Sequence, residues 1–391
     1  MAASQNGLKQ VSDRRAKDAR DLCRYLRILK ATVVLATLTG SASAILITMS
    51  PLTFFLLRFF TIHWSRQLNA FIFGRWLSMW PFFFEKVNKT QVIFSGHNVP
   101  EAERAIVICN HRTEVDWMYI WNLALRKKRV GSVKYVVKSS VKNVPIFGWA
   151  FHVLEFLLVN RSWQVDELVF ESMLSTFKGF QDPLWLVIFP EGTDYTEAKC
   201  EKSQKFAMDN GLPKLHHVLL PRTKGVYASL AQLHDSVDAV YDLTIGYKNK
   251  CPLFIENALG TEPKEVHIHV KRIPISDITI TEAGVSEWLV KEFETKDALL
   301  SHFYSKGRFP EGCIIEKDLN TILGIADCCF TVGLSWVFFF LFWAFPWFKV
   351  YAALSCTLLT ASTYVNYKPR PYWKHQSATS SKEKNGVNHH Y

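Results

Sequence analysis

Two short polar segments, about 80 residues apart, carry side chains of the kinds that do acid–base chemistry. The first, residues 110–117, reads NHRTEVDW and places His111 five positions before Asp116. A carboxylate bonded to one imidazole nitrogen fixes the tautomer and leaves the other nitrogen as a base. With 13 histidines in the chain, the number of chance matches to this spacing is on the order of one. We expect a catalytic pair, with a solvated loop histidine as the alternative.

The chain places no nucleophile beside this pair. Ser132, Ser139 and Ser140 have no special setting, and Cys109 falls in an apolar strand pattern that turns it away. The base would therefore activate a hydroxyl group of a substrate rather than a side chain of the protein. The eight cysteines contain no C-x-x-C pair, so we expect reduced thiols and no zinc site made of cysteines.

The second segment, residues 189–193, reads FPEGT. Its proline ends an apolar run, and its glycine lets the backbone approach a ligand closely. We expect Glu191, Gly192 and Thr193 to bind a polar or phosphate-bearing substrate, and an ordinary turn is the alternative.

Several cations near these segments are candidates for binding an anionic substrate. Arg161 follows an apolar run and is the first candidate, because a guanidinium group binds phosphate oxygens in pairs. Arg222 and Lys224 come next, although each could be a plain surface charge.

Strand-like and helix-like patterns alternate along residues 85–305, and these elements must position the residues described above. We expect an α/β layered domain, in which function lies at the carboxyl ends of strands. Both segments directly follow an apolar strand pattern, at residues 105–109 and 184–189. Further strands are expected at residues 133–137, 156–159, 217–220, 239–245 and 266–270, and helices at 117–125, 141–153, 164–179, 224–234 and 282–304.

The two ends of the chain are apolar and predict membrane helices. Residues 1–30 form a basic arm with eight Lys or Arg against three Asp, which indicates a cytosolic start. Residues 31–84 predict an N-terminal membrane-embedded helical unit, with a buried soluble helix as the alternative. After a linker at 306–321, residues 322–365 predict a pair of transmembrane helices, and 366–391 a disordered basic tail.

The net charge of +11 fits an anionic membrane surface or a phosphate-bearing substrate. We expect no nucleic-acid partner, because no basic run stands apart from the apolar segments and no nucleic-acid-binding signature is present.

Four ordered blocks resemble the glycerolipid acyltransferases, and most closely the 1-acyl-sn-glycerol-3-phosphate acyltransferases. The blocks are NHRTEVDW, the glycine and arginine of GWAFHVLEFLLVNR, FPEGT, and VLLP at residues 218–221. The stretch from FPEGTDYTEAKCEKSQKFA to NGLPKLHHVLLPRTKG is similar to the plant branch of that group, and to animal lysophosphatidylinositol and lysocardiolipin acyltransferases.

The resemblance implies an acyl transfer that needs no cofactor, metal ion or covalent acyl-enzyme. His111 would take the proton of the sn-2 hydroxyl of a lysophospholipid, Asp116 would orient it, and acyl-CoA would be the donor substrate. Glu191, Gly192 and Thr193, with Arg161, would position the glycerol phosphate. The resemblance also implies the endoplasmic reticulum membrane, and the basic ends predict a catalytic domain that faces the cytosol.

One residue departs from the family pattern and leaves the acceptor open. Many members have arginine directly after Glu-Gly-Thr, where this chain has Asp194. An acidic residue there would repel the phosphomonoester of lysophosphatidic acid unless a cation neutralises it. Lysophosphatidylinositol, lysophosphatidylglycerol and lysocardiolipin are therefore alternative acceptors, and a catalytically silent membrane scaffold is a third hypothesis.

Overall fold

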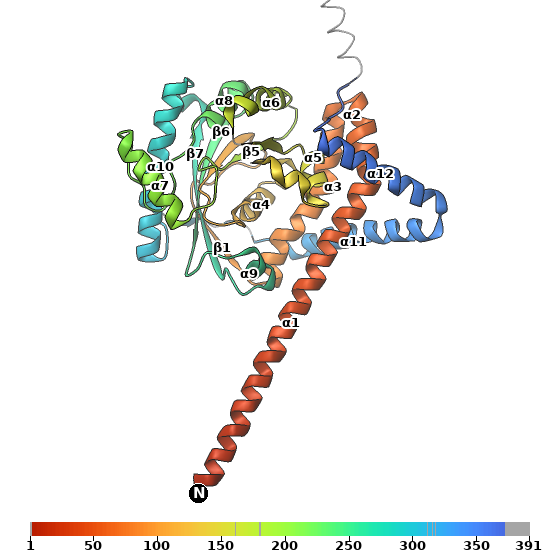
Figure 1. The fold of residues 1–391 in the computed structure, drawn as a ribbon, viewed down its shortest axis with the longest axis vertical. Helices are drawn as coiled ribbons and strands as arrows, with labels where there is room; N and C mark the ends of the chain where they lie inside the picture. The colour runs from red at the N-terminus through yellow and green to blue at the C-terminus, as the bar shows by residue number, and fades with distance from the viewer. Residues whose placement is uncertain are drawn as a thin grey trace, which may run out of the picture.

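A mixed β-sheet lies at the centre of the described chain (Figure 1). The computed structural model describes residues 2–160, 162–179, 181–310, 312–314, 316 and 318–371. Within them, eight strands lie in the order β4–β3–β5–β2–β6–β7–β1–β8. Neighbours from β4 to β6 are parallel, β7 is antiparallel to β6 and parallel to β1, and β8 is antiparallel to β1. The strands are β1 (Gln91–Gly96), β2 (Ala105–Cys109), β3 (Val133–Lys138), β4 (Leu157–Val159), β5 (Trp185–Ile188), β6 (Ala239–Tyr247), β7 (Glu265–Pro274) and β8 (Cys313–Ile314).

The sequence of β2 shows why the sheet is buried on both faces. Ala105, Val107 and Cys109 belong to one hydrophobic core, and Ile106 and Ile108 belong to another, because alternate side chains of a strand point to opposite faces. Helices cover both faces, which confirms the predicted layered α/β class. The helices of this region are α4 (Asp116–Arg126), α5 (Phe147–Val153), α6 (Trp163–Ser175), α7 (Glu197–Asp209), α8 (Lys224–Leu233), α9 (Phe254–Leu259) and α10 (Glu282–Lys306). Of these, α4 and α5 contribute to one core, and α6, α8 and α10 contribute to the other.

The strand predicted at residues 217–220 is wrong, and its backbone hydrogen bonds give the reason. The amide of His217 donates to Asp297 Oδ1 over 2.5 Å, and the amide of Leu219 donates to Glu191 Oε2 over 2.9 Å. Side-chain carboxylates therefore take the place of a neighbouring strand, although the apolar side chains Val218 and Leu219 are buried. The helix predicted at 141–153 is also shorter than expected, because residues 139–143 form a 3₁₀ turn before α5.

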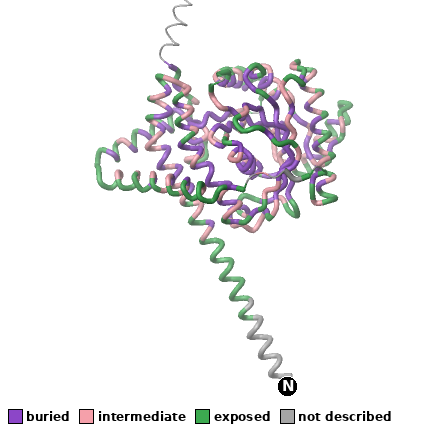
Figure 2. The backbone as a smooth tube through the Cα atoms, turned by 180° about the vertical axis from the view of Figure 1, so that it is seen from behind, coloured by how far each residue is buried: buried purple, intermediate pink, exposed green. Residues whose placement is uncertain are grey.

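Three helices make up the N-terminal region. α1 (Ala2–Ser50) continues through a π-helical turn, Pro51–Leu56, into α2 (Leu57–Phe60), and α3 (Ile62–Phe82) returns along it. Residues 17–29 of α1 project from the body and are exposed (Figure 2). In contrast, Trp76 and Trp80 of α3 belong to the same core as β2 and α4, so the packing runs across the expected boundary at residues 84 and 85.

Two helices form a hairpin at the other end of the described chain, α11 (Thr321–Ala344) and α12 (Pro346–Tyr364). By length and composition, Lys17–Phe60 and Thr321–Ala344 are apolar enough to cross a membrane. α11 packs on α1 and α3, and α12 packs on α1 and α5. Most of the predicted disordered tail, residues 372–391, lies outside the described residues.

Polar contacts connect this hairpin to the N-terminal helices. Arg75 of α3 pairs with Asp327 of α11 over 2.6 Å, and Tyr351 Oη of α12 donates to the Thr48 carbonyl of α1 over 2.7 Å. Beyond α12, the Pro369 carbonyl accepts a hydrogen bond of 2.9 Å from Nε of Arg58, whose guanidinium also pairs with buried Glu155. The two ends of the described chain are therefore held together by buried polar groups.

Candidate active site

The sheet brings the two polar segments together. β2 and β5 are parallel neighbours in a register that pairs Ile108 with Ile188. Each polar segment begins directly after its strand, so both leave the same edge of the sheet side by side. The predicted meeting of these segments at the carboxyl ends of strands is therefore present, although 80 residues separate His111 from Glu191.

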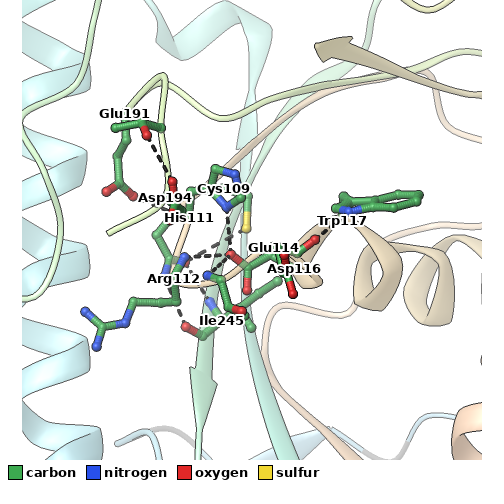
Figure 3. A network of polar contacts seen from close by, with 12 residues as sticks. Cys109, His111, Arg112, Glu114, Asp116, Trp117, Glu191, Asp194 and Ile245 are labelled. Atoms are coloured by element: carbon green, nitrogen blue, oxygen red, sulfur yellow. Dashed lines mark hydrogen bonds and ion pairs between the residues drawn. The ribbon is translucent and has the colours of Figure 1, made fainter. Parts of the chain in front are cut away.

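His111 and Asp116 form the expected hydrogen-bonded pair. His111 Nδ1 lies 2.9 Å from Asp116 Oδ2 (Figure 3). Because Asp116 is an acceptor here, Nδ1 carries the proton and Nε2 has a free lone pair. Burial lowers the pKa of His111, but the hydrogen bond and charge of Asp116, with the charges of Glu191 and Asp194, outweigh burial and raise the pKa above its ordinary value.

Asp116 is fully buried and fixed at the start of α4. Its Oδ2 also accepts hydrogen bonds from the backbone amides of Arg112 and Thr113, over 2.6 and 2.9 Å. Its Oδ1 accepts a hydrogen bond of 2.6 Å from Tyr247 Oη at the end of β6. These donors hold the carboxylate in one orientation, so the imidazole is held as well.

Glu191 connects three separate loops. One carboxylate oxygen accepts from the backbone amide of His111 over 2.7 Å, and the other accepts from the amide of Leu219 over 2.9 Å. Burial raises the pKa of Glu191 to about 7, although both amides favour the charged form. Its oxygens thus position the histidine loop, and its predicted contact with the substrate stays a prediction.

Gly192 turns the chain with a positive φ of 71°, a conformation that favours glycine. A Cβ atom at this position would lie 3.2 Å from Nε of Arg222, so the arginine side chain covers the glycine. The next residues form a small polar group: Lys199 Nζ lies 2.9 Å from Thr193 Oγ1 and 2.8 Å from Asp194 Oδ1. Lys199 is therefore the cation that neutralises Asp194.

A cavity of about 760 Å³ opens beside His111. Its volume is within the range of sites that bind small organic ligands. His111, Gly192 and three cations, Lys138, Arg222 and Lys224, contribute to its wall. Much of the remaining wall is apolar and comes from several elements: Trp117, Tyr135, Val136, Phe151, Phe156, Val159, Trp163, Phe170, Phe206, Leu212 and Val290.

The remaining predicted residues have different outcomes. Arg161, the first cation candidate, lies outside the described residues, whereas Arg222 and Lys224 line the cavity. Cys109 is buried beneath the site, and burial raises the pKa of its thiol well above the ordinary value. A neutral, buried thiol is a poor nucleophile.

Two supporting residues were not predicted from the sequence. Tyr247 binds the Asp116 carboxylate, and the side chain of Asn110 bonds both the amide and the carbonyl of Ile245, over 2.8 and 3.0 Å. Both contacts join the histidine loop to β6. Tyr247 lies at the carboxyl end of a strand, and this position was the feature of the sequence that could have indicated a role in the site.

Comparison with known protein families identifies the class of enzyme to which this domain belongs. The sequence pattern of the family described as Acyltransferase matches residues 91–248, which contain the histidine–aspartate pair and the cavity-lining segment after β5. A second pattern, described as Acyltransferase C-terminus, matches residues 257–325. This α/β body is thus an acyltransferase domain.

Individual relatives then define the family more closely. The chain is 49% identical to "Probable 1-acyl-sn-glycerol-3-phosphate acyltransferase 5" of Arabidopsis thaliana, over 90% of this chain and 94% of that protein. It is 36% identical to "Lysocardiolipin acyltransferase 1" of Gallus gallus, over 70% and 73%. The chain belongs to the acyltransferase family that contains these two proteins. A solved structure, the 1-acyl-sn-glycerophosphate (LPA) acyltransferase PlsC from Thermotoga maritima, is 14% identical with a TM-score of 0.41 over 72% of this chain and 98% of that one.

Proposed function

We propose that this protein transfers an acyl chain from acyl-CoA to the sn-2 hydroxyl of 1-acyl-sn-glycerol 3-phosphate and so makes phosphatidic acid. One observation carries the proposal: a histidine oriented by a buried aspartate lines a cavity whose wall is partly cationic and largely apolar. The cations suit the phosphate of the acceptor, and the apolar wall suits acyl chains. The printed name of the Arabidopsis relative supports this acceptor.

The chemistry needs one base and no covalent intermediate. Nε2 of His111 removes the proton of the sn-2 hydroxyl as its oxygen attacks the thioester carbonyl carbon. The tetrahedral intermediate collapses, the C–S bond breaks, and the imidazolium returns its proton to the leaving thiolate. Asp116 stabilises the imidazolium through the 2.9 Å hydrogen bond. Each step of this scheme uses only His111, Asp116 and the two substrates, and acyl-CoA is one of those substrates rather than a cofactor.

The predicted contacts with the acceptor belong to the same proposal. Gly192 and Thr193 lie at the turn beside the cavity, and Arg161 follows β4. We place the glycerol phosphate over this turn. Glu191 contributes by holding the loops on either side of it.

The direct test is His111→Ala, with His234→Ala as a matched control on an exposed surface. His111→Ala should lower the rate of oleoyl transfer from oleoyl-CoA to lysophosphatidic acid by about 10²- to 10⁴-fold. Its thermal unfolding should remain close to that of the wild type, and His234→Ala should keep its activity. Wild-type turnover in a folded His111→Ala protein would contradict the mechanism, whereas a folded wild-type protein that transfers no acyl chain would support the hypothesis of a silent scaffold.

A second acceptor class is supported by Asp194 and by the lysocardiolipin acyltransferases among the relatives. In this alternative the same chemistry would reacylate lysophosphatidylinositol, lysophosphatidylglycerol or lysocardiolipin. Because Lys199 neutralises Asp194, the acidic residue alone does not exclude a phosphomonoester. The measurement is a panel of lysophospholipids with labelled oleoyl-CoA, in which a tenfold preference for lysophosphatidic acid would decide for the first proposal.

We place the protein in the endoplasmic reticulum membrane, with the catalytic domain facing the cytosol. Two helical segments of sufficient length and apolar composition support membrane residence. The basic residues 14–30, which precede the apolar part of α1, support a cytosolic start.

A further inference from the structure

The guanidinium of Arg222 lies on the turn that follows β5 and contains Gly192. It packs against Gly192 so closely that a Cβ atom there would be 3.2 Å from Nε and 3.4 Å from Cζ. The backbone amide of Arg222 donates to the Pro190 carbonyl over 2.8 Å. The backbone of Arg222 is therefore fixed to the loop that carries Glu191, and Glu191 in turn binds the amide of His111.

The residue after Glu-Gly-Thr does not compete for this arginine. Asp194 has its own partner in Lys199, over 2.8 Å, and hydrogen bonds from Lys199 and Thr193 outweigh partial burial and lower the pKa of Asp194. Asp194 and Lys199 together carry no net charge. Within the described part of the chain, no carboxylate pairs with Arg222, so its guanidinium is available to a ligand.

Arg222 is also better suited to a phosphate than the other cations in the cavity wall. Lys138 and Lys224 are point charges on flexible side chains, whereas a guanidinium presents a planar pair of donors that matches two phosphate oxygens. Arg222 is exposed to solvent at the cavity, so it can bind a ligand without breaking a buried contact. Its backbone anchor also gives it the more direct structural connection to His111.

We infer that Arg222 is a specificity-determining residue that binds the phosphate of the acceptor lipid. Arg222 comes directly after the VLLP block at residues 218–221. The inference rests on the proposed acyl transfer and adds a headgroup contact to it. Because an arginine interacts more strongly with a doubly charged phosphomonoester than with a singly charged phosphodiester, Arg222 favours lysophosphatidic acid over lysophosphatidylinositol.

The test compares Arg222→Gln, Arg222→Lys and the wild type, with Arg308→Gln as a matched control at an exposed arginine. Arg222→Gln should raise KM for lysophosphatidic acid by about 10- to 100-fold, since one charge-assisted contact is lost. The rise in KM for lysophosphatidylinositol should be several times smaller than the rise for lysophosphatidic acid, and KM for oleoyl-CoA should not change. Arg222→Lys should recover part of the loss, and Arg308→Gln should match the wild type.

Measuring KM for each substrate also distinguishes a contact with the acceptor phosphate from a contact with the phosphates of acyl-CoA. A rise confined to KM for oleoyl-CoA would assign Arg222 to the phosphates of CoA and overturn the inference. An unchanged KM for lysophosphatidic acid, or equal rises for both acceptors, would overturn it as well. If the wild type transfers no acyl chain to any lysophospholipid, the proposed function fails first. If the wild type acylates lysophosphatidic acid and Arg222→Gln does so equally well, only the role of Arg222 fails.

Discussion

Asp116→Asn is the substitution that isolates the charge of the catalytic pair from its geometry. Oδ2 of Asp116 accepts from three donors, His111 Nδ1 and the amides of Arg112 and Thr113, and Oδ1 accepts from Tyr247 Oη. An asparagine with its carbonyl oxygen in place of Oδ2 keeps the three contacts, and the tyrosine hydroxyl can rotate to accept from the new NH₂ group. The substitution therefore removes a negative charge and leaves the hydrogen-bond framework in place.

The expected loss follows from what the charge does. As His111 takes the proton, its imidazolium loses a charged partner 2.9 Å away and keeps a neutral one. A hydrogen bond to a charged group contributes about 1.5–3 kcal/mol, against about 1 kcal/mol for a neutral one. The activation free energy should rise by about 0.5–2 kcal/mol from this difference, which corresponds to a decrease in kcat of about 2- to 30-fold. Asp116→Ala would instead leave buried donors unpaired and should unfold the loop.

The pH dependence gives a second, independent measure. The base works only when neutral, so kcat/KM should fall as the pH drops through the pKa of His111. Asp116 holds that pKa above its ordinary value, so the acidic limb of the wild-type profile should lie above about 6.5. Asp116→Asn removes the negative charge, lowers the pKa and moves this limb to lower pH. The assay is initial-rate acyl transfer between pH 5 and 9, with thermal unfolding as the folding control. An acidic limb that stays in place, or a folded Asp116→Asn protein with unchanged kcat, would refute the roles given to the pair.

Two further predictions concern the contacts of Glu191 and the orientation of the catalytic domain. Glu191→Gln replaces one of two acceptors with a donor that faces the amide of either His111 or Leu219, so the free energy of unfolding should fall by about 1–3 kcal/mol. The control is Glu201→Gln on α7 rather than Gln204→Glu, because the Gln204 side chain bonds Leu215. Equal denaturation midpoints for Glu191→Gln and Glu201→Gln would contradict the role of Glu191. Asn88 and the exposed Asn160 each begin an Asn-x-Ser/Thr glycosylation sequence, and a cytosolic catalytic domain predicts that neither carries a glycan; a mobility shift on endoglycosidase treatment of the protein from microsomes would place that domain in the lumen.

The local patterns predicted the strand ends but not the contacts between them. β2 and β5 were predictable because five or six consecutive apolar residues stop at a polar segment, as buried parallel strands do. The partnership of His111 with Asp116 was within reach because only five positions separate them. Glu191 and Tyr247 act on residues 80 and 131 positions away, and no local pattern carries such information.

The sequence patterns missed helix α7 and wrongly predicted a strand at residues 217–220, for opposite reasons. α7 was not predicted, since its sequence EAKCEKSQKFAMD buries only Cys200 and Ala207 and so has no clear apolar stripe. Residues 217–220 were predicted as a strand from apolar content, yet side-chain carboxylates take their amide hydrogen bonds. Trp76 and Trp80 fall in the predicted membrane-embedded unit, residues 31–84, whereas packing places them in the core with the sheet.

The docking of the C-terminal hairpin has a practical consequence for work with this protein. Arg75 and Ser78 both bind Asp327, and the side chain of Arg58 reaches the Pro369 carbonyl. Cutting the chain before α11, to obtain a more soluble fragment, would leave the Arg75 side chain without its carboxylate partner and uncover apolar surface on α1 and α3. The hairpin is therefore part of the folded unit rather than a removable anchor, and purification should retain the chain through residue 371 in detergent or lipid.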